Sequence, residues 1–370
     1  MSRSPADPEV VVRLATPADE PDIRRLVAST PMPGAVAIRF AREPDYFLGT
    51  TIMGDPCDVF VGRSADGRLA GILCRAEHLA YVNGVATRIG YIGQIRVADG
   101  FRGRWLLHRS MALFREASPA GLLYMGVIAR ENPRARGVLL ERRPPGGLRS
   151  VRLSGLTTCA IMLRGRRVVR VSGLEATTAA AVGAEAVVSF LRANGPRRQL
   201  YPDYTATDFT GGRALRGLGL EDVAVVLRGG EIAGVMASWD QASFKQDVVD
   251  GYGPTLRRLR PGYDLAARLI GARPLTPPGS AIPLSFAACT CVADDDPEVM
   301  RLLLAVATAR ARAQGKAFLM LGLADEDPLL RVARRWLHVT YRSDLYALSW
   351  DDDPATRLDT RIPYIEIGTL

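Results

Sequence analysis

The sequence predicts an α/β fold with a mixed sheet, built as two similar units in tandem. Three observations support this prediction. Strand-like and helix-like segments alternate along residues 10–163, a second series in the same order occupies residues 222–349, and the chain has 370 residues, of which 48% are hydrophobic. A chain of this length exceeds the size at which a single core usually stops growing, so two domains of ordinary size are expected.

The first unit begins with an apolar strand at 9–15 and a helix at 19–29. Thr16 or Asp19 is a suitable N-cap for this helix, because a short side chain with an oxygen atom can accept a hydrogen bond from the exposed N–H groups of the first turn. The apolar face of the helix consists of residues at helical spacing, namely Ile23, Leu26 and Val27. This pattern predicts an amphipathic helix that packs against a sheet.

Two β-rich runs within residues 58–82 flank the turn residues Ala65, Asp66 and Gly67, which is a strong short-range hairpin signal. The rest of the first unit consists of a strand at 89–97, a helix at about 103–117, a short strand near 121–129 and a helix-compatible segment at 131–143. A hairpin followed by strands that alternate with helices is typical of a mixed sheet.

The second unit repeats this order of elements. It contains a hairpin at 222–239 that turns on Gly229 and Gly230, a strand, turn and long helix at 282–315, a strand at 316–323, a helix at 327–336 and a closing strand or hairpin at 338–350. The similarity lies in element order and hardly in residues, so duplication is a hypothesis. The predicted domains are 1–165 and 166–350, followed by a docked C-terminal tail at 351–370.

The turn before the long helix of the second unit is acidic, with Asp294, Asp295 and Asp296 in a row. These charges would repel an anion. Asp296 is instead a good N-cap, with Pro297 at the first helical position. We therefore expect a structural helix start there and no cofactor site.

The corresponding segment of the first unit, residues 91–116, is basic. It comprises an apolar strand, a turn of arginine and glycine residues, and an amphipathic helix. A helix N-terminus presents unpaired N–H groups and the positive end of the helix dipole to any ligand bound there. This segment therefore predicts a site for a cofactor that carries phosphate groups.

The order of residues in this segment resembles the acyl-CoA-binding segment of the GNAT N-acyltransferase superfamily. The matching residues are Val97, Phe101, Arg102, Gly103 and Arg104, while Trp105 and Leu107 stand at two later positions where the family has glycine. The order of elements over residues 10–163 is also that of the family. The resemblance implies a GNAT fold and N-acyl transfer from acetyl-CoA or another acyl-CoA to a small-molecule or peptide amine.

The resemblance also implies which residues bind the acyl-CoA. Backbone groups of Ile95, Arg96 and Val97 would pair with the pantetheine arm. The pyrophosphate would meet Arg102, Gly103, Arg104, Trp105, Leu106 and Leu107. Asn132, together with Ala135, matches the family's Asn-x-x-Ala pattern and is assigned to the same cofactor site.

The general acid of the family, a tyrosine, is replaced by Leu139 and Leu140 in this chain. Tyr91 and Gln94, near the start of the central strand, are the nearest polar candidates for catalysis. Some multi-domain relatives use a C-terminal carboxylate as the base, which makes Leu370 a third candidate. The apolar alternation before Leu370 predicts that the chain end is docked as a strand or in a cleft.

Residues 39–47 combine aromatic and basic side chains after the first helix, where the family places the wall of the acceptor site. Acceptor lining and ordinary packing of Tyr46 and Phe47 both remain open for this segment.

The formal net charge is +9. Arginines are dense between residues 130 and 170, where the neighbouring acidic residues are Glu131 and Glu141. Such a segment suits the phosphates of CoA, an RNA backbone or a solvated face, but it matches no RNA-binding motif, so nucleic acid is disfavoured. Two alternatives stay open: a non-catalytic tandem binding module, and a transferase that uses aminoacyl-tRNA as donor, as Fem-type ligases do.

The five cysteines are scattered and the three histidines are dispersed, so we expect reduced thiols and no metal site. The sequence shows neither a membrane-spanning apolar run nor the apolar core of a secretion signal, which predicts a cytoplasmic protein.

Overall fold

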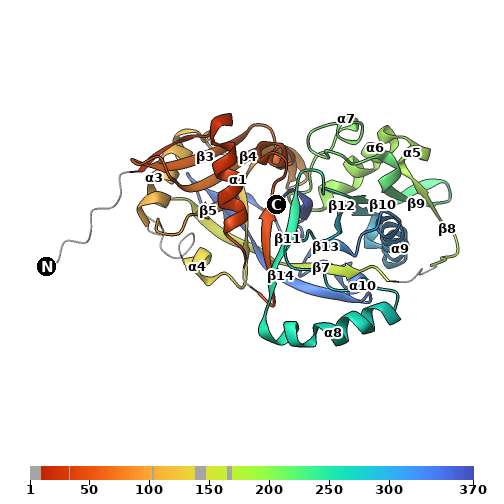
Figure 1. Cartoon of the computed structure of the whole chain (residues 1–370). Helices are drawn as coiled ribbons and strands as arrows, with labels where there is room; N and C mark the ends of the chain where they lie inside the picture. Colours follow the sequence, from red (N-terminus) through yellow and green to blue (C-terminus); the bar gives the residue numbers. More distant parts are fainter. Residues whose placement is uncertain (1–9, 33, 102–103, 138–146, 165–168) are drawn as a thin grey trace.

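The computed structural model describes residues 10–32, 34–101, 104–137, 147–164 and 169–370, without the side chains of 104–109 and Arg134. Within this part of the chain, twelve strands form one mixed sheet in the order β1-β3-β4-β5-β6-β14-β7-β13-β12-β10-β9-β8, and β2 pairs with β11 in a separate ribbon (Figure 1). The strands are β1 (Val10–Leu14), β2 (Val36–Ala41), β3 (Cys57–Ser64), β4 (Leu69–Val82), β5 (Val85–Val97), β6 (Tyr124–Ala129), β7 (Arg149–Met162), β8 (Leu174–Thr178), β9 (Val223–Arg228), β10 (Glu231–Trp239), β11 (Gln246–Tyr252), β12 (Leu284–Val292), β13 (Phe318–Ala324) and β14 (His338–Ser349). The α-helices are α1 (Glu20–Ser29), α2 (Tyr46–Thr50), α3 (Arg104–Glu116), α4 (Pro133–Arg136), α5 (Ala179–Val182), α6 (Ala184–Asn194), α7 (Ala206–Phe209), α8 (Pro254–Leu269), α9 (Pro297–Ala313) and α10 (Leu330–Ala333).

The two halves of the sheet have equivalent strand orders when each is followed from its outer edge to the middle of the sheet. From one edge the strands are β1, β3, β4, β5, β6 and β14; from the other they are β8, β9, β10, β12, β13 and β7. The closing strands are exchanged, because β14 lies between β6 and β7, while β7 lies between β14 and β13. One sheet thus runs through both halves, and the division near residue 165, between β7 and β8, stays a prediction.

Each half of the sheet is covered on both faces, which explains why its strands are apolar without strict alternation. On β4, Ile72 and Cys74 pack in the core beneath α1, whereas Leu73 packs on the opposite face with Phe114 of α3. In the second half, one face packs against α6 and the other against α9. The helices α1 and α3 therefore lie on opposite faces of the first half.

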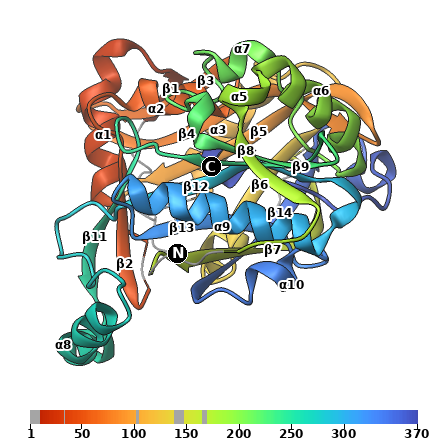
Figure 2. The ribbon, with the colours of Figure 1, turned by 90° about the vertical axis from the view of Figure 1, so that its right-hand side faces the viewer.

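The β2–β11 ribbon joins distant parts of the sequence, with Phe40 opposite Asp247 in antiparallel register. Figure 2 shows the ribbon extending from the body of the molecule, with α8 at its far end. Because β2 belongs to the first half and β11 to the second, the ribbon ties the two halves together outside the main sheet.

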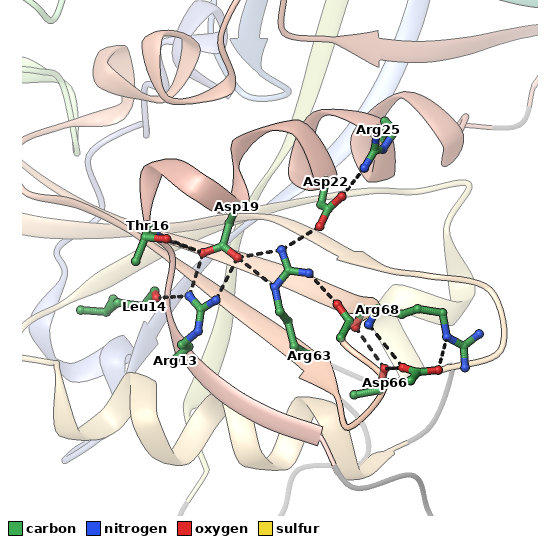
Figure 3. A network of polar contacts seen from close by, with 11 residues as sticks. Arg13, Leu14, Thr16, Asp19, Asp22, Arg25, Arg63, Asp66 and Arg68 are labelled. Atoms are coloured by element: carbon green, nitrogen blue, oxygen red, sulfur yellow. Dashed lines mark hydrogen bonds and ion pairs between the residues drawn. The ribbon is translucent and has the colours of Figure 1, made fainter.

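A buried carboxylate fixes the start of α1 to the sheet (Figure 3). Asp19 accepts hydrogen bonds from Arg13 Nη1 at 2.7 Å, from Arg63 Nε at 2.9 Å and from the Thr16 N–H at 2.8 Å. The hydrogen bond with Arg13 is the main cause that holds the pKa of Asp19 far below its usual value, against the opposing effect of burial. Thr16 and Asp19 form a capping box around the 3-10 turn Pro17–Asp19 that precedes α1. Asp19 is the N-cap residue of α1, but its side chain makes no capping hydrogen bond to that helix.

Local sequence signals predicted many of these elements correctly. The hairpin turns lie at Ala65–Gly67 and at Gly229 and Gly230, and the Asp296 carboxylate accepts from the N–H groups of Glu298 and Val299 as the N-cap of α9. The helix predicted at 327–336 is shorter than expected, because α10 covers only Leu330–Ala333. Within the helix-compatible segment at 131–143, Pro133–Arg136 forms α4. Part of this segment, residues 138–143, lies outside the described residues.

The five cysteines are present as free thiols. None of the described helices is long and apolar enough to cross a membrane. No cluster of three or more histidine, cysteine or acidic side chains with metal-binding geometry occurs in the described ranges.

Candidate active site

The candidate active site lies where two parallel strands of the first half separate. β5 and β6 pair only at Gly90 with Tyr124 and at Tyr91 with Met125. Beyond these pairs β5 remains with β4, β6 remains with β14, and β5 leads on toward α3. Neighbouring strands that separate leave backbone groups for which an extended ligand is a suitable partner.

A β-bulge marks the point of separation. The register of β4 against β5 shifts between Ile72, opposite Arg96, and Cys74, opposite Gly93. Gln94 falls within this shift and has a φ of +52°. A non-glycine residue with positive φ is uncommon, and bulges and such strained residues concentrate near functional sites because they redirect backbone groups.

The second half contains the same construction. β12 and β13 are parallel and pair only along Leu284–Phe286 and Phe318–Met320. The register of β10 against β12 then shifts, and Cys289 within the shift has a φ of +53°. Both halves therefore place a positive-φ residue where two central parallel strands separate.

In the second half this place is occupied by the chain's own C-terminal segment. Glu366 Oε2 accepts from the Cys289 N–H at 2.8 Å, and the Tyr364 hydroxyl oxygen accepts from the Thr290 N–H at 3.2 Å. Ile367 lies directly against β13, since a Cβ at Gly322 would come within 2.3 Å of Ile367 Cγ2. The second separation is thus filled by protein and leaves no room there for a cofactor arm.

Glu366 is buried among hydroxyl groups. The hydroxyls of Tyr364 and Tyr204 donate to its Oε2 at 2.9 and 3.2 Å, in addition to the N–H of Cys289. Burial raises the pKa of Glu366 to about 6, although these hydrogen bonds act in the opposite direction. The carboxyl group therefore changes its charge close to physiological pH.

In the first half, the predicted catalytic residue Tyr91 lies along β5 over Gly93. A Cβ at Gly93 would come within 2.2 Å of the Tyr91 hydroxyl oxygen, so only glycine leaves room for the ring. Burial raises the pKa of Tyr91, which keeps the phenol protonated at neutral pH. The other candidate on this strand, Gln94, has a buried side-chain oxygen with no hydrogen-bond partner among the described residues.

Two arginines lie beside Tyr91 on the face covered by α1. The guanidinium carbons of Arg42 and Arg96 lie 5.8 and 5.4 Å from the centre of the Phe40 ring. Burial lowers the pKa of both groups. The guanidiniums in turn oppose the rise in the pKa of Tyr46 and Tyr91 that burial causes, so the four side chains are within electrostatic range of one another.

Lys245 holds the chain end at the edge of this group. Its Nζ donates to the carbonyl oxygen of Gly368 at 2.8 Å and to an oxygen of Leu370 at 2.6 Å. Leu370 packs against the same core as Tyr91. Burial lowers the pKa of Lys245 to about 7. The predicted residue Leu370 therefore comes to the first-half site together with a lysine that the sequence interpretation missed.

The described residues of the predicted cofactor site direct their side chains to both faces of the sheet. Ile95 packs on the α3 face, whereas the Arg96 side chain turns to the α1 face and Val97 packs near Phe101. Asn132 uses its side-chain oxygen to accept from the Ala135 N–H at 3.0 Å, as the cap of α4. Arg102 and Gly103 lie outside the described residues, as do the side chains of Arg104, Trp105, Leu106 and Leu107.

The basic segment at 130–170 is partly neutralised by strands that are distant in sequence. Arg130 pairs with Asp325 of β13 and with Asp344 of β14, both at 2.8 Å. Arg136 and Arg152 also pair with Asp344, at 3.3 and 3.0 Å. These ion pairs are part of the fold, which weakens the argument for a nucleic-acid surface.

A hollow of about 500 Å³ lies elsewhere, between α1 and the β3–β4 turn (Figure 3). Its charged walls are already paired, Asp22 with Arg25 and Arg63, and Asp66 with Arg68. This hollow therefore offers no group that is poised for chemistry.

No family model matches the sequence, and no curated protein sequence is significantly similar to it. Solved structures are similar to it in fold. The GCN5-related glucosamine N-acetyltransferase region of a fungal multi-domain GH3 β-N-acetylglucosaminidase aligns with 94% of this chain at 13% identity and a TM-score of 0.60, and the chain spans 39% of that protein. Two structures of Saccharomyces cerevisiae N-myristoyltransferase with bound myristoyl-CoA align with 94% of this chain at 11% identity, with TM-scores of 0.57 and 0.58 and coverage of 86% and 80% of their own chains.

Proposed function

We propose that this chain, which has the fold of GNAT N-acyltransferases, transfers an acyl group, with acetyl as the first candidate, from acyl-CoA to an amine. The observation that carries the proposal is the separation of β5 from β6 at the Gln94 bulge, ahead of α3. The pantetheine arm would pair with β5 at residues 95–97, and residues 102–107 would meet the pyrophosphate. The filled separation in the second half supports a single donor site per chain.

Transfer from a thioester needs a neutral amine, donors for the developing oxyanion and a proton for the leaving thiolate. The backbone of the Gln94 bulge is the candidate donor for the oxyanion. Tyr91 is the candidate acid, because burial keeps its hydroxyl protonated. These assignments follow from the proposed position of the thioester at the bulge.

Two groups compete for the role of base. In a chain that ends at Leu370, its carboxylate is held at the site by Lys245. Lys245 itself has a pKa of about 7, close to the value at which a general base works best at neutral pH. An ammonium bound to a carboxylate lowers the basicity of the carboxylate, so only one of the two acts as base in a given protonation state.

A thermal-shift titration with acetyl-CoA, free CoA and myristoyl-CoA tests the donor site. At a free concentration about one hundred times Kd, a bound ligand adds roughly 2.7 kcal/mol to the free energy of unfolding. We expect acetyl-CoA to raise the melting temperature. If no acyl-CoA raises the melting temperature, the chain is better explained as a non-catalytic binding module than as an enzyme. Binding of tRNA that weakens with added salt would instead favour a transferase that uses aminoacyl-tRNA as donor.

A further inference from the structure

Arg42 is a buried cation and Arg96 a half-buried one, and both have unused hydrogen-bond donors. Arg42 is 1% exposed, and its Nη1 donates to the Ala41 carbonyl oxygen at 2.8 Å. Arg96 donates from Nη1 to the Ile95 carbonyl oxygen at 3.0 Å. The Nε of each is buried and has no partner among the described residues. Burying a charge without a counter-charge is costly, so this arrangement needs an explanation.

Other donors point to the same place. The Tyr46 hydroxyl is fully buried and has no hydrogen-bond partner among the described residues. Arg42 is pressed against α2, since a Cβ at Gly49 would come within 2.9 Å of its Cδ. Phe40 lies within cation–π range of both guanidiniums and holds them near each other. The group is therefore fixed in shape and consists mainly of donors.

The described side chains supply little negative charge to this group, and the chain end at Leu370 is bound by Lys245. The carboxylate that interacts with Arg42 is Asp247, whereas the neighbours of Arg96 are Tyr46 and Tyr91. Burial raises the pKa of Asp247, so its charged form is itself disfavoured. A rigid set of donors with a deficit of negative charge is complementary to an anion.

An anion bound by this group would lie at a different place from the phosphates of the donor. Arg42 and Arg96 lie on the face covered by α1, whereas the pyrophosphate is assigned to the N-terminus of α3, on the opposite face. We propose that the amine acceptor carries a carboxylate, as an amino acid does, and that Arg42, Arg96 and the Tyr46 hydroxyl bind this carboxylate. The planar guanidinium fork matches a carboxylate in geometry, and the amine would then face the Gln94 bulge. This inference rests on the transferase function proposed above.

The test is acetyl transfer by the full chain to three matched sets of acceptors: the twenty amino acids, their primary amides and the corresponding decarboxylated amines. We expect kcat/KM for the best amino acid to exceed that of its amide at least about a hundredfold, because an amide leaves the buried cations unpaired. Arg42→Met should remove this preference without changing the Kd of acetyl-CoA, and Arg96→Met should remove the preference as well. Arg25→Met, an exposed arginine on α1, is the control variant and should keep it.

Separate outcomes distinguish the failure of this inference from failure of the transferase function. Absence of acetyl-CoA binding by the wild type overturns the function; a thermal shift with amino acids alone, measured without CoA, still reports on the anion site. If acetyl-CoA binds but acids, amides and amines react equally, or no amino acid binds or reacts, the inference is wrong. A preference for phosphoethanolamine as acceptor would show that the cations bind a phosphate. An effect of Arg96→Met that appears only with succinyl-CoA as donor would show that they bind the acyl group. Either result also overturns the inference. If Arg42→Met does not fold, Arg42→Lys and Arg96→Met carry the test.

Discussion

Glu366 should make the stability of this protein fall as the pH rises through the range of its titration. Its pKa is raised from 4.5 to about 6 in the folded chain. The folded state therefore binds the proton more tightly than the unfolded state, so this stabilising contribution is complete below pH 4.5 and is lost as the pH rises through 6. At about 1.4 kcal/mol per unit of pKa shift, the loss is about 2 kcal/mol. The shift needs no discount for solvent, because Glu366 is 3% exposed.

Urea unfolding of the wild type and Glu366→Gln between pH 4.5 and 7.5 measures this loss. We expect the variant to gain about 2 kcal/mol relative to the wild type across the range, because glutamine cannot ionise. The Glu366 charge raises the pKa of Lys245, so Lys245 also contributes to the difference at the upper end of this range, near its own pKa of about 7. Glu231→Gln, at an exposed turn, is the control and should show no such trend. A difference between Glu366→Gln and wild type that stays constant with pH would refute the reasoning.

Three further perturbations follow from the contacts described above. Gly93→Ala should displace Tyr91 and cost about 1–3 kcal/mol in urea unfolding, and an unchanged stability would contradict the close contact. Asp19→Ala should lower the free energy of unfolding by about 3 kcal/mol at pH 7. This loss should shrink below about pH 4, because a carboxylate with a lowered pKa stabilises the fold only while it is charged. A loss that does not depend on pH would exclude the charge as its cause. If the Leu370 carboxylate is the base, deleting Thr369 and Leu370 should abolish turnover while the Kd of acetyl-CoA stays unchanged; full turnover would remove Leu370 from the catalytic residues.

Signals that act over a few residues allowed the local structure to be predicted. Asp296 caps α9 because its carboxylate reaches N–H groups two and three residues further on, and Gly229 and Gly230 form a hairpin turn because both accept positive φ. These interactions are complete within the segment that forms them. Their residue types therefore determine the outcome almost regardless of the rest of the chain.

The exchanged positions of β7 and β14 in the sheet could not be predicted from such local signals. Both strands mix apolar and polar residues, and such a pattern does not specify which neighbour a strand joins. Their placement depends on pairs such as Leu345 with Val127 and Leu321 with Cys159, which join residues far apart in the sequence. The ion pairs of Arg130 with Asp325 and Asp344 escaped notice for the same reason.

The candidate site was predicted only in part. Tyr91 and Gln94 were chosen as candidates because they lie on one strand beside a motif, and Leu370 because the tail is apolar. Lys245 was missed, although it is one of only two lysines in an arginine-rich chain, and that rarity was a usable signal. Glu366 offered no such signal, since its meaning depends on Cys289 and two tyrosines that only the folded chain brings together.

The two halves contain the same backbone feature but differ in what occupies it. Both separate a pair of parallel strands beside a positive-φ residue, but only the second half provides its own occupant for the gap, with Glu366 receiving three donors. The first half instead holds the buried Arg42 and the half-buried Arg96, and the Nε of each has no partner among the described residues. Buried unpaired charge lowers the stability of a fold by several kcal/mol. A ligand that pairs with these cations would therefore stabilise the first half, whereas the gap of the second half is already occupied by the C-terminal segment. For this reason we place the chemistry at the Gln94 bulge and not at the Cys289 bulge.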